Sequence, residues 1–333
     1  MGAYRLLLAM LVAISHMGVQ VAGFNPGVVA VISFLIISGF VMTSLIDRNY
    51  NSLRQVPLFY LDRALRLYPQ FLLYFVISAL VIHFLLPGTP PAAALTLHNI
   101  LGSLLIVPMG FYMYGLNLPD ILPPAWSLGL EMCFYLVIPF LIIFNARGWA
   151  FAASLLVFLV AMAGYINTDL YGYRLLPGVL FIFLCGSYLY RASSKGVMVV
   201  WATLVMAVLL CLAITSSVLP RLPFNTEVAL GLAVGIPAVY LLSQRRYHRL
   251  DDFLGNLSYG VFLNHFVVIY GLRAFAWPAD YTTSSISVVL LLSVGLSIVS
   301  YYYVERPALK LRHAFRAGVR LSADAKHGSS TVA

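Results

Sequence analysis

The chain has 333 residues, of which 62% are hydrophobic and only 9% are charged, and its mean hydropathy is +0.93. Soluble domains carry about 25% charged residues, so this composition excludes them and predicts an all-α, polytopic membrane protein. A net charge of +9 would favour nucleic-acid binding in a soluble chain, but here the basic residues gather in alternate loops, and we expect no nucleic-acid partner. Cys133, Cys185 and Cys211 are odd in number and lie in apolar segments, which indicates no disulfide framework.

Ten apolar segments approach the length that crosses a bilayer, roughly 17 to 25 residues. They lie near 6–24, 28–46, 70–86, 127–145, 149–166, 175–190, 197–218, 227–243, 254–272 and 283–304. An eleventh candidate near 98–115 is shorter and is interrupted by three glycines and Pro108. The spans and their short loops use nearly the whole chain, so we expect neither an attached soluble domain nor a cleaved signal peptide.

The distribution of Lys and Arg residues predicts whether segment 98–115 crosses the membrane. With ten crossings and a cytoplasmic N-terminus, 17 of the 20 Lys and Arg residues lie inside, and only Arg174, Arg221 and Arg273 lie outside, as the positive-inside rule requires. An eleventh crossing would move the basic loop 245–249 and the basic tail outside. We therefore expect about ten transmembrane helices with 98–115 re-entrant or interfacial, a membrane domain over 1–307, and a basic cytoplasmic tail over 308–333. This tail should begin as an interfacial helix on anionic lipid and end disordered.

Arg5 stands at the entrance of the first apolar segment, and His16 lies eleven positions further on, near the middle of that segment. At about 100° per residue the two share a helix face and lie about 16 Å apart along the axis. An ionisable side chain at such a depth usually faces the protein interior or a water-filled cavity. The pair is either a deep catalytic base with a cationic anchor below it, or a structural histidine with an arginine that sets topology.

Two further groups of polar residues lie at the ends of predicted spans. Arg63 and Arg66 are three apart and share a face, and with Arg5 they would form an inner mouth suited to a phosphate-rich cytoplasmic ligand, unless they only determine topology. Ser127 and Glu131 share a face near the outer end of the fourth span. A carboxylate there must be paired, protonated or in a wet cavity, so Glu131 is either functional or a structural partner of a buried cation.

The ninth span adds a second deep histidine. Ser258 and His265 are seven apart on one face, and His265 lies at a depth like that of His16 in a span of the same direction. Two histidines at one depth predict a shared cavity, although a single one would be structural. Glu305, at the inner end of the last span, is expected to pair with an inner arginine. We expect no metal site.

In chain order, the motifs that stand out are Arg5 with His16, 34-FLIISGF-40, 63-RALRLYP-69, 126-WSLGLE-131, 257-LSYGVFLNH-265 and 305-ERP-307. This series resembles the acyltransferase family 3 integral-membrane O-acyltransferases from residue 5 to about 307. The resemblance implies a ten-helix core in the bacterial inner membrane that moves an acyl group, usually acetyl, from cytoplasmic acyl-CoA to a hydroxyl. The acceptor is typically an outer or lipid-linked glycan, such as exopolysaccharide or O-antigen, and some members act on small natural products. Acetyl-CoA would be a substrate, with no cofactor bound permanently.

Residue by residue, the resemblance implies that His16 is catalytic, that Arg5 is its essential partner and that Arg63 and Arg66 line the acyl-CoA entrance, with Glu131 on the acceptor side. Around the substrates we expect Ser38, Trp126, Ser127, Ser258, Tyr259, His265 and Glu305. Two departures stand out. Met132 occupies the place of a second acidic residue found in many relatives, and the periplasmic esterase-like domain of some relatives is absent.

The expected mechanism has His16 remove a proton from the acceptor hydroxyl, whose oxygen then attacks the thioester, with Ser258 or Ser127 as candidate oxyanion donors. An acyl-histidine intermediate stays open. Two other functions remain: a proton-coupled secondary transporter with His and Glu as proton relays, against which stands the missing inverted repeat, and a non-catalytic subunit of a polysaccharide-export assembly. Membrane lipids and polysaccharide-biosynthesis proteins are the expected partners.

Overall fold

The computed structural model describes residues 1–116, 119–246, 248–275 and 283–330. Its α-helices are α1 (Gly2–His16), α2 (Pro26–Asn49), α3 (Val56–Leu85), α4 (Pro90–Ala93), α5 (Leu97–Leu105), α6 (Ala125–Ile143), α7 (Arg147–Met162), α8 (Leu176–Arg191), α9 (Ser194–Thr215), α10 (Asn225–Ser243), α11 (Arg249–Ala274), α12 (Thr283–Ser300) and α13 (Arg306–Ser330). Shorter turns are the 3-10 helices η1 (Leu53–Gln55), η2 (Val107–Tyr114) and η3 (Pro119–Ile121), and the π turns η4 (Leu170–Arg174) and η5 (Tyr301–Glu305).

The regular secondary structure of the described residues is helical, without a named strand, which confirms the predicted all-α membrane class. Eight of its helices are long and apolar enough to cross a bilayer, and α1 and α7 are shorter apolar helices of 15 and 16 residues. These match the ten predicted segments. The segment near 98–115 forms α5 and η2, which meet at a kink at Ile106 (φ 65°) and are not among the spanning helices.

Helix ends differ from the apolar segments in three places. Helix α1 stops at His16, not near residue 24, because Gly18 and Gly23 take positive φ in the following loop. The side chain of Asn25 then caps α2 ahead of Pro26. Helix α3 begins at Val56, not near residue 70, and continues through Pro69.

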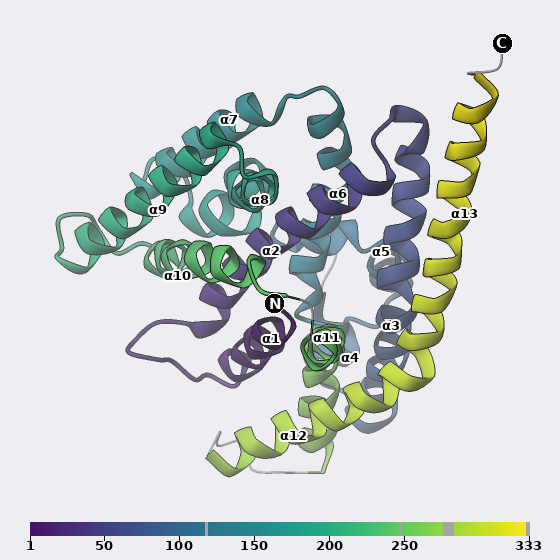
Figure 1. The fold of residues 1–333 in the computed structure, drawn as a ribbon. Helices are drawn as coiled ribbons and strands as arrows, with labels where there is room; N and C mark the ends of the chain where they lie inside the picture. Colours follow the sequence, from purple (N-terminus) through teal and green to yellow (C-terminus); the bar gives the residue numbers. More distant parts are fainter. Residues whose placement is uncertain (117–118, 247, 276–282, 331–333) are drawn as a thin grey trace.

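The basic tail is helical. Helix α13 continues from α12 through η5 and reaches Ser330. Figure 1 shows α13, in yellow, running beside α3 along one edge of the molecule, and the two helices are in contact. The tail is therefore part of the helical assembly.

Helices α1 and α2 organise the interior. Helix α2 packs on α8, α10 and α1, and α1 packs along α11. Small residues make these approaches possible: Gly39 faces the backbone of α8, and Gly2 faces the backbone of α11 beside Gly255. The α1–α11 contact fixes the height of His16 against His265.

We expect Gly39→Ala to destabilise the protein by about 1–3 kcal/mol or more, because overpacking forces helices apart. A Cβ at Gly39 would lie 1.7 Å from the carbonyl oxygen of Phe183. Thermal unfolding in detergent measures the effect. Gly271→Ala is the matched control, since a Cβ there meets nothing within 4 Å. Equal midpoints for the two variants would contradict the close α2–α8 contact.

Candidate active site

His16 and His265, predicted to share a cavity, are in direct contact. Nδ1 of His16 lies 3.0 Å from Nε2 of His265. Nδ1 of His265 lies 3.1 Å from the carbonyl oxygen of Val261, one turn earlier in α11. His265 is fully buried and His16 is half-buried, with the ring of Phe266 edge-on to His16 at 5.1 Å. The Val261 carbonyl, His265 and His16 therefore form a short polar chain.

A cavity of about 320 Å³ lies against His16. Its lining includes Trp126 and Ser127, two of the residues expected near the substrates, whereas Glu131, Ser258 and His265 are not in this lining. The other lining residues are Val12, Ser15, Asn25, Gly27, Val28, Val31, Tyr112, Pro123, Pro124, Tyr173, Arg174, Phe224 and Phe262. Most come from helix ends and loops that the positive-inside rule predicts to be outside, and the cavity reaches inward to Val12, one turn below His16.

Arg174 is a cavity residue that the sequence analysis did not select. Its guanidinium lies 4.7 Å from the ring centre of Trp126 and 5.6 Å from that of Tyr112, and its Nε donates to Asp169 at 2.6 Å. Cation–π contacts of this kind hold an arginine rigidly. Burial raises the pKa of the Tyr112 phenol against the opposing effect of Arg174, so the phenol stays neutral and able to donate a hydrogen bond. An arginine beside several aromatic residues, as in 171-YGYR-174, was the available signal.

Glu131 lies one turn after Ser127 in α6 and is not in the cavity lining. Its carboxylate accepts hydrogen bonds from Ser38 at 2.5 Å and from Tyr135 at 2.6 Å. Glu131 also lies within electrostatic range of Arg5, in the first turn of α1. The structure thus joins the expected residues Ser38 and Glu131 to each other by a hydrogen bond.

Arg5 has charged neighbours but no tight partner. Arg66, Glu131 and Glu305 all lie within electrostatic range of its guanidinium. Over the residues that the structure describes, none forms a hydrogen bond or ion pair with that guanidinium. A cation with several neighbours but no fixed partner retains donors for an anionic ligand.

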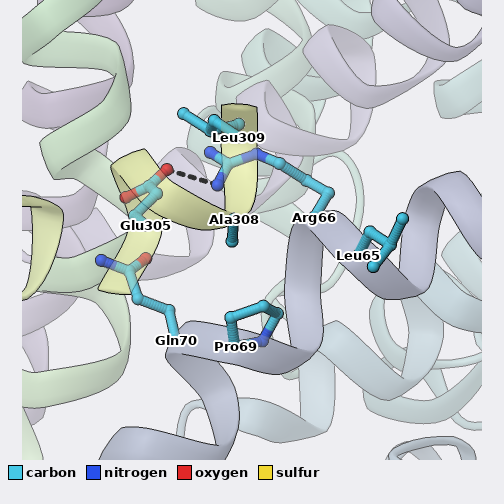
Figure 2. Close-up of a pocket in the computed structure, with 7 residues that line it drawn as sticks. All are labelled: Leu65, Arg66, Pro69, Gln70, Glu305, Ala308 and Leu309. Carbon is cyan, nitrogen blue, oxygen red and sulfur yellow. Dashed lines mark hydrogen bonds and ion pairs between the residues drawn. The ribbon is translucent and has the colours of Figure 1, made fainter. Parts of the chain in front are cut away.

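Arg66 forms an ion pair with Glu305, as the sequence analysis expected of an inner arginine. Figure 2 shows the two groups facing each other between α3 and the start of α13, above Pro69 and Gln70. Arg66 also lies over the ring of Tyr259 at 5.4 Å. The small recess around the pair has no room for a water molecule, so a ligand reaches Arg66 only after the pair opens.

Arg63 points to other partners, although it is only three residues from Arg66. It pairs with Asp62, whose carboxylate also accepts from Arg312 at 3.1 Å and from Arg316 at 2.5 Å. Asp62 is fully buried and Arg63 is 4% exposed. The guanidinium of Arg63 is thus part of a buried ion cluster that attaches α13 to α3, and Asp62 is a key residue that the sequence analysis missed.

The hydroxyl groups of Ser258 and Tyr259 are both hydrogen-bonded to backbone carbonyls of helices. The Ser258 hydroxyl donates to the carbonyl of Gly255 at 2.6 Å, and Tyr259 donates to the carbonyl of Leu67 at 3.1 Å. No cluster of three metal-ligating side chains occurs among the described residues.

These features define a multi-pass helical membrane protein with His16 beside a cavity at one end of α1 and Arg5 near the opposite end of the same helix. The model of the family described as acyltransferase domain matches residues 3–304. The chain therefore belongs to acyltransferase family 3, which confirms the resemblance carried by its motifs, and it is a membrane acyltransferase.

Three relatives show how widely the match extends. An uncharacterised protein of Aquifex aeolicus (strain VF5) is 34% identical over 58% of this chain and 90% of its own length. Exopolysaccharide production protein ExoZ of Rhizobium meliloti (strain 1021) is 27% identical over 90% of this chain and 95% of its own. Nodulation protein 10 of Rhizobium leguminosarum bv. viciae is 26% identical over 86% and 83%. No solved structure gives a significant match.

Proposed function

We propose that this protein is an O-acyltransferase of the bacterial inner membrane that moves an acyl group, in the first instance acetyl, from cytoplasmic acyl-CoA to a hydroxyl of an extracytoplasmic or lipid-linked glycan. The proposal is supported chiefly by the position of His16, which lines a cavity at one end of α1, while Arg5 and Arg66 lie within electrostatic range of each other near the other end. The similarity to an exopolysaccharide production protein supports a glycan acceptor. Both termini are cytoplasmic in this proposal, as the positive-inside rule predicts.

The acceptor occupies the outer cavity. Its hydroxyl approaches His16, while Trp126 and Tyr112 supply the aromatic surface and phenol that sugars commonly contact. His16 removes the hydroxyl proton, the oxygen attacks the thioester carbonyl, and the carbon–sulfur bond breaks. The protonated His16 returns that proton to the departing CoA thiolate, so the imidazole ends the cycle neutral.

The donor enters from the inner side. Arg5 and Arg66 are the guanidiniums placed to bind CoA phosphates, whereas Arg63 is held by Asp62. Between Arg5 and His16 the shared helix face is closed by Ala9, which is fully buried. The long pantetheine arm therefore needs α1 and its neighbours to separate before the thioester reaches His16, and opening of the Arg66–Glu305 pair is one component of that movement.

Sealed vesicles of both orientations test this function. Radiolabelled acetyl-CoA supplied to the cytoplasmic face of inverted vesicles should label the glycan fraction, and the same donor outside right-side-out vesicles should not, because CoA does not cross the bilayer. Vesicles lacking the protein are the control. Label that depends on donor at the extracytoplasmic face would contradict the proposed direction, and absence of label in both would contradict acetyl transfer to glycan.

Arg5→Gln should raise the acetyl-CoA concentration needed for half-maximal labelling.

A further inference from the structure

We propose that His265 is a positioning residue that holds His16 in the tautomer with its proton on Nδ1, leaving Nε2 as the base that faces the acceptor. This inference rests on the proposed function for its catalytic meaning, but its structural content stands on the contacts of the two rings alone.

The backbone contact of His265 fixes which of its ring nitrogens carries the proton. A carbonyl oxygen has no proton to donate, so the 3.1 Å contact between Val261 and Nδ1 of His265 is a hydrogen bond only if that nitrogen carries the proton. In a neutral imidazole the other nitrogen, Nε2, is then an acceptor. His265 is fully buried among apolar residues, where the neutral ring is the form expected.

The contact between the two rings then fixes the tautomer of His16. Since Nε2 of His265 accepts, Nδ1 of His16 at 3.0 Å must be the donor. The ring planes differ by 14° and the centroids are 5.2 Å apart. This separation exceeds the nitrogen–nitrogen distance by about one ring diameter, so the bond lies in the plane of both rings and is not a face-to-face stack. A bond of this geometry has a defined direction.

This tautomer determines which nitrogen of His16 can act as a base. With its proton on Nδ1, a neutral His16 has its lone pair on Nε2. Within the described part of the chain no residue hydrogen-bonds that nitrogen, and the ring lines the outer cavity. A free histidine side chain favours the opposite tautomer, with the proton on Nε2, which would present a donor to the acceptor hydroxyl instead of a base. The Val261–His265–His16 chain corrects this preference, and when His16 takes the proton, His265 accepts from the resulting imidazolium.

Two substitutions separate positioning from packing. In His265→Gln the side-chain oxygen can take the place of Nε2 and accept from His16, whereas His265→Leu removes the acceptor and keeps an apolar side chain. We expect kcat/KM for acyl transfer to stay within about tenfold of wild type in His265→Gln and to fall by about 10²-fold or more in His265→Leu, within the range of a general base.

The nitrogen-15 spectrum of histidine-labelled protein reads the tautomer without any activity. The chain has seven histidines, and the His16 signals are those lost in His16→Asn. We expect the proton of His16 on Nδ1 in wild type and in His265→Gln, and a shift towards Nε2 in His265→Leu. A wild-type His16 protonated on Nε2 overturns the proposal, as does a His265→Leu variant equal to His265→Gln in both measurements.

The spectrum also separates this inference from the proposed function. If wild-type vesicles transfer no acyl group, the proposed function fails while the tautomer is still measured. If His265→Leu does not fold, the wild-type and His265→Gln spectra decide alone: a proton on Nε2 in either overturns the proposal, and a proton on Nδ1 in both supports it.

Discussion

His16→Asn should lower acyl transfer by about 10²–10⁴-fold, the contribution expected of a general base, while the protein stays folded. Asparagine is the informative replacement because its side-chain amide can still donate to Nε2 of His265, so the contact with α11 survives and only the base is lost. Initial rates of acetyl transfer in inverted vesicles, at equal protein content, measure the effect.

His83→Asn is the matched control for His16. His83 lies in the last turn of α3, is exposed and is not in the cavity lining, so its replacement should leave the rate unchanged. A His16→Asn protein that retained more than about a tenth of wild-type transfer would remove His16 from the catalytic role, since general bases contribute at least about a hundredfold.

Asp62→Leu should destabilise the folded protein by about 3–5 kcal/mol, because it leaves Arg63 buried without its counter-charge. Asp62 is the shared acceptor of Arg63, Arg312 and Arg316, so its loss also releases α13 from α3. Thermal unfolding in detergent reads the first effect, and faster tryptic cleavage after Arg312 reads the second.

The exposed pair of Asp47 with Arg191 provides the control for Asp62. Its side chains are 22% and 37% exposed, and Asp47→Asn should cost at most about 1 kcal/mol. The double variant Asp62→Leu/Arg63→Leu should recover part of the loss, since removing both buried charges is less harmful than removing one. A single variant as stable as Asp47→Asn would contradict the buried cluster.

The membrane class and the number of apolar segments could be predicted because hydropathy is a local property of the chain. The common face of Arg5 and His16 and the matching depth of His265 followed from helix geometry, and the structure joins the two histidines at 3.0 Å. The predicted end of the first span near residue 24 was wrong. The apolar residues continue to that point, but the helix is stopped by glycines at positive φ, and hydropathy carries no information on backbone conformation.

Sequence alone determined that this protein is a helical membrane protein of acyltransferase family 3 with His16 and Arg5 on one helix face. Tertiary structure decided which charges meet. Arg63 and Arg66 lie three residues apart on the same helix. Arg63 nevertheless pairs with its neighbour Asp62, whereas Arg66 pairs with Glu305, 239 residues away. The aromatic surroundings of Arg174 likewise come from η2, α6, η4 and the residue before α10. A buried charge is stable only beside the counter-charge or ring that packing delivers to it, and packing is a property of the assembled helices.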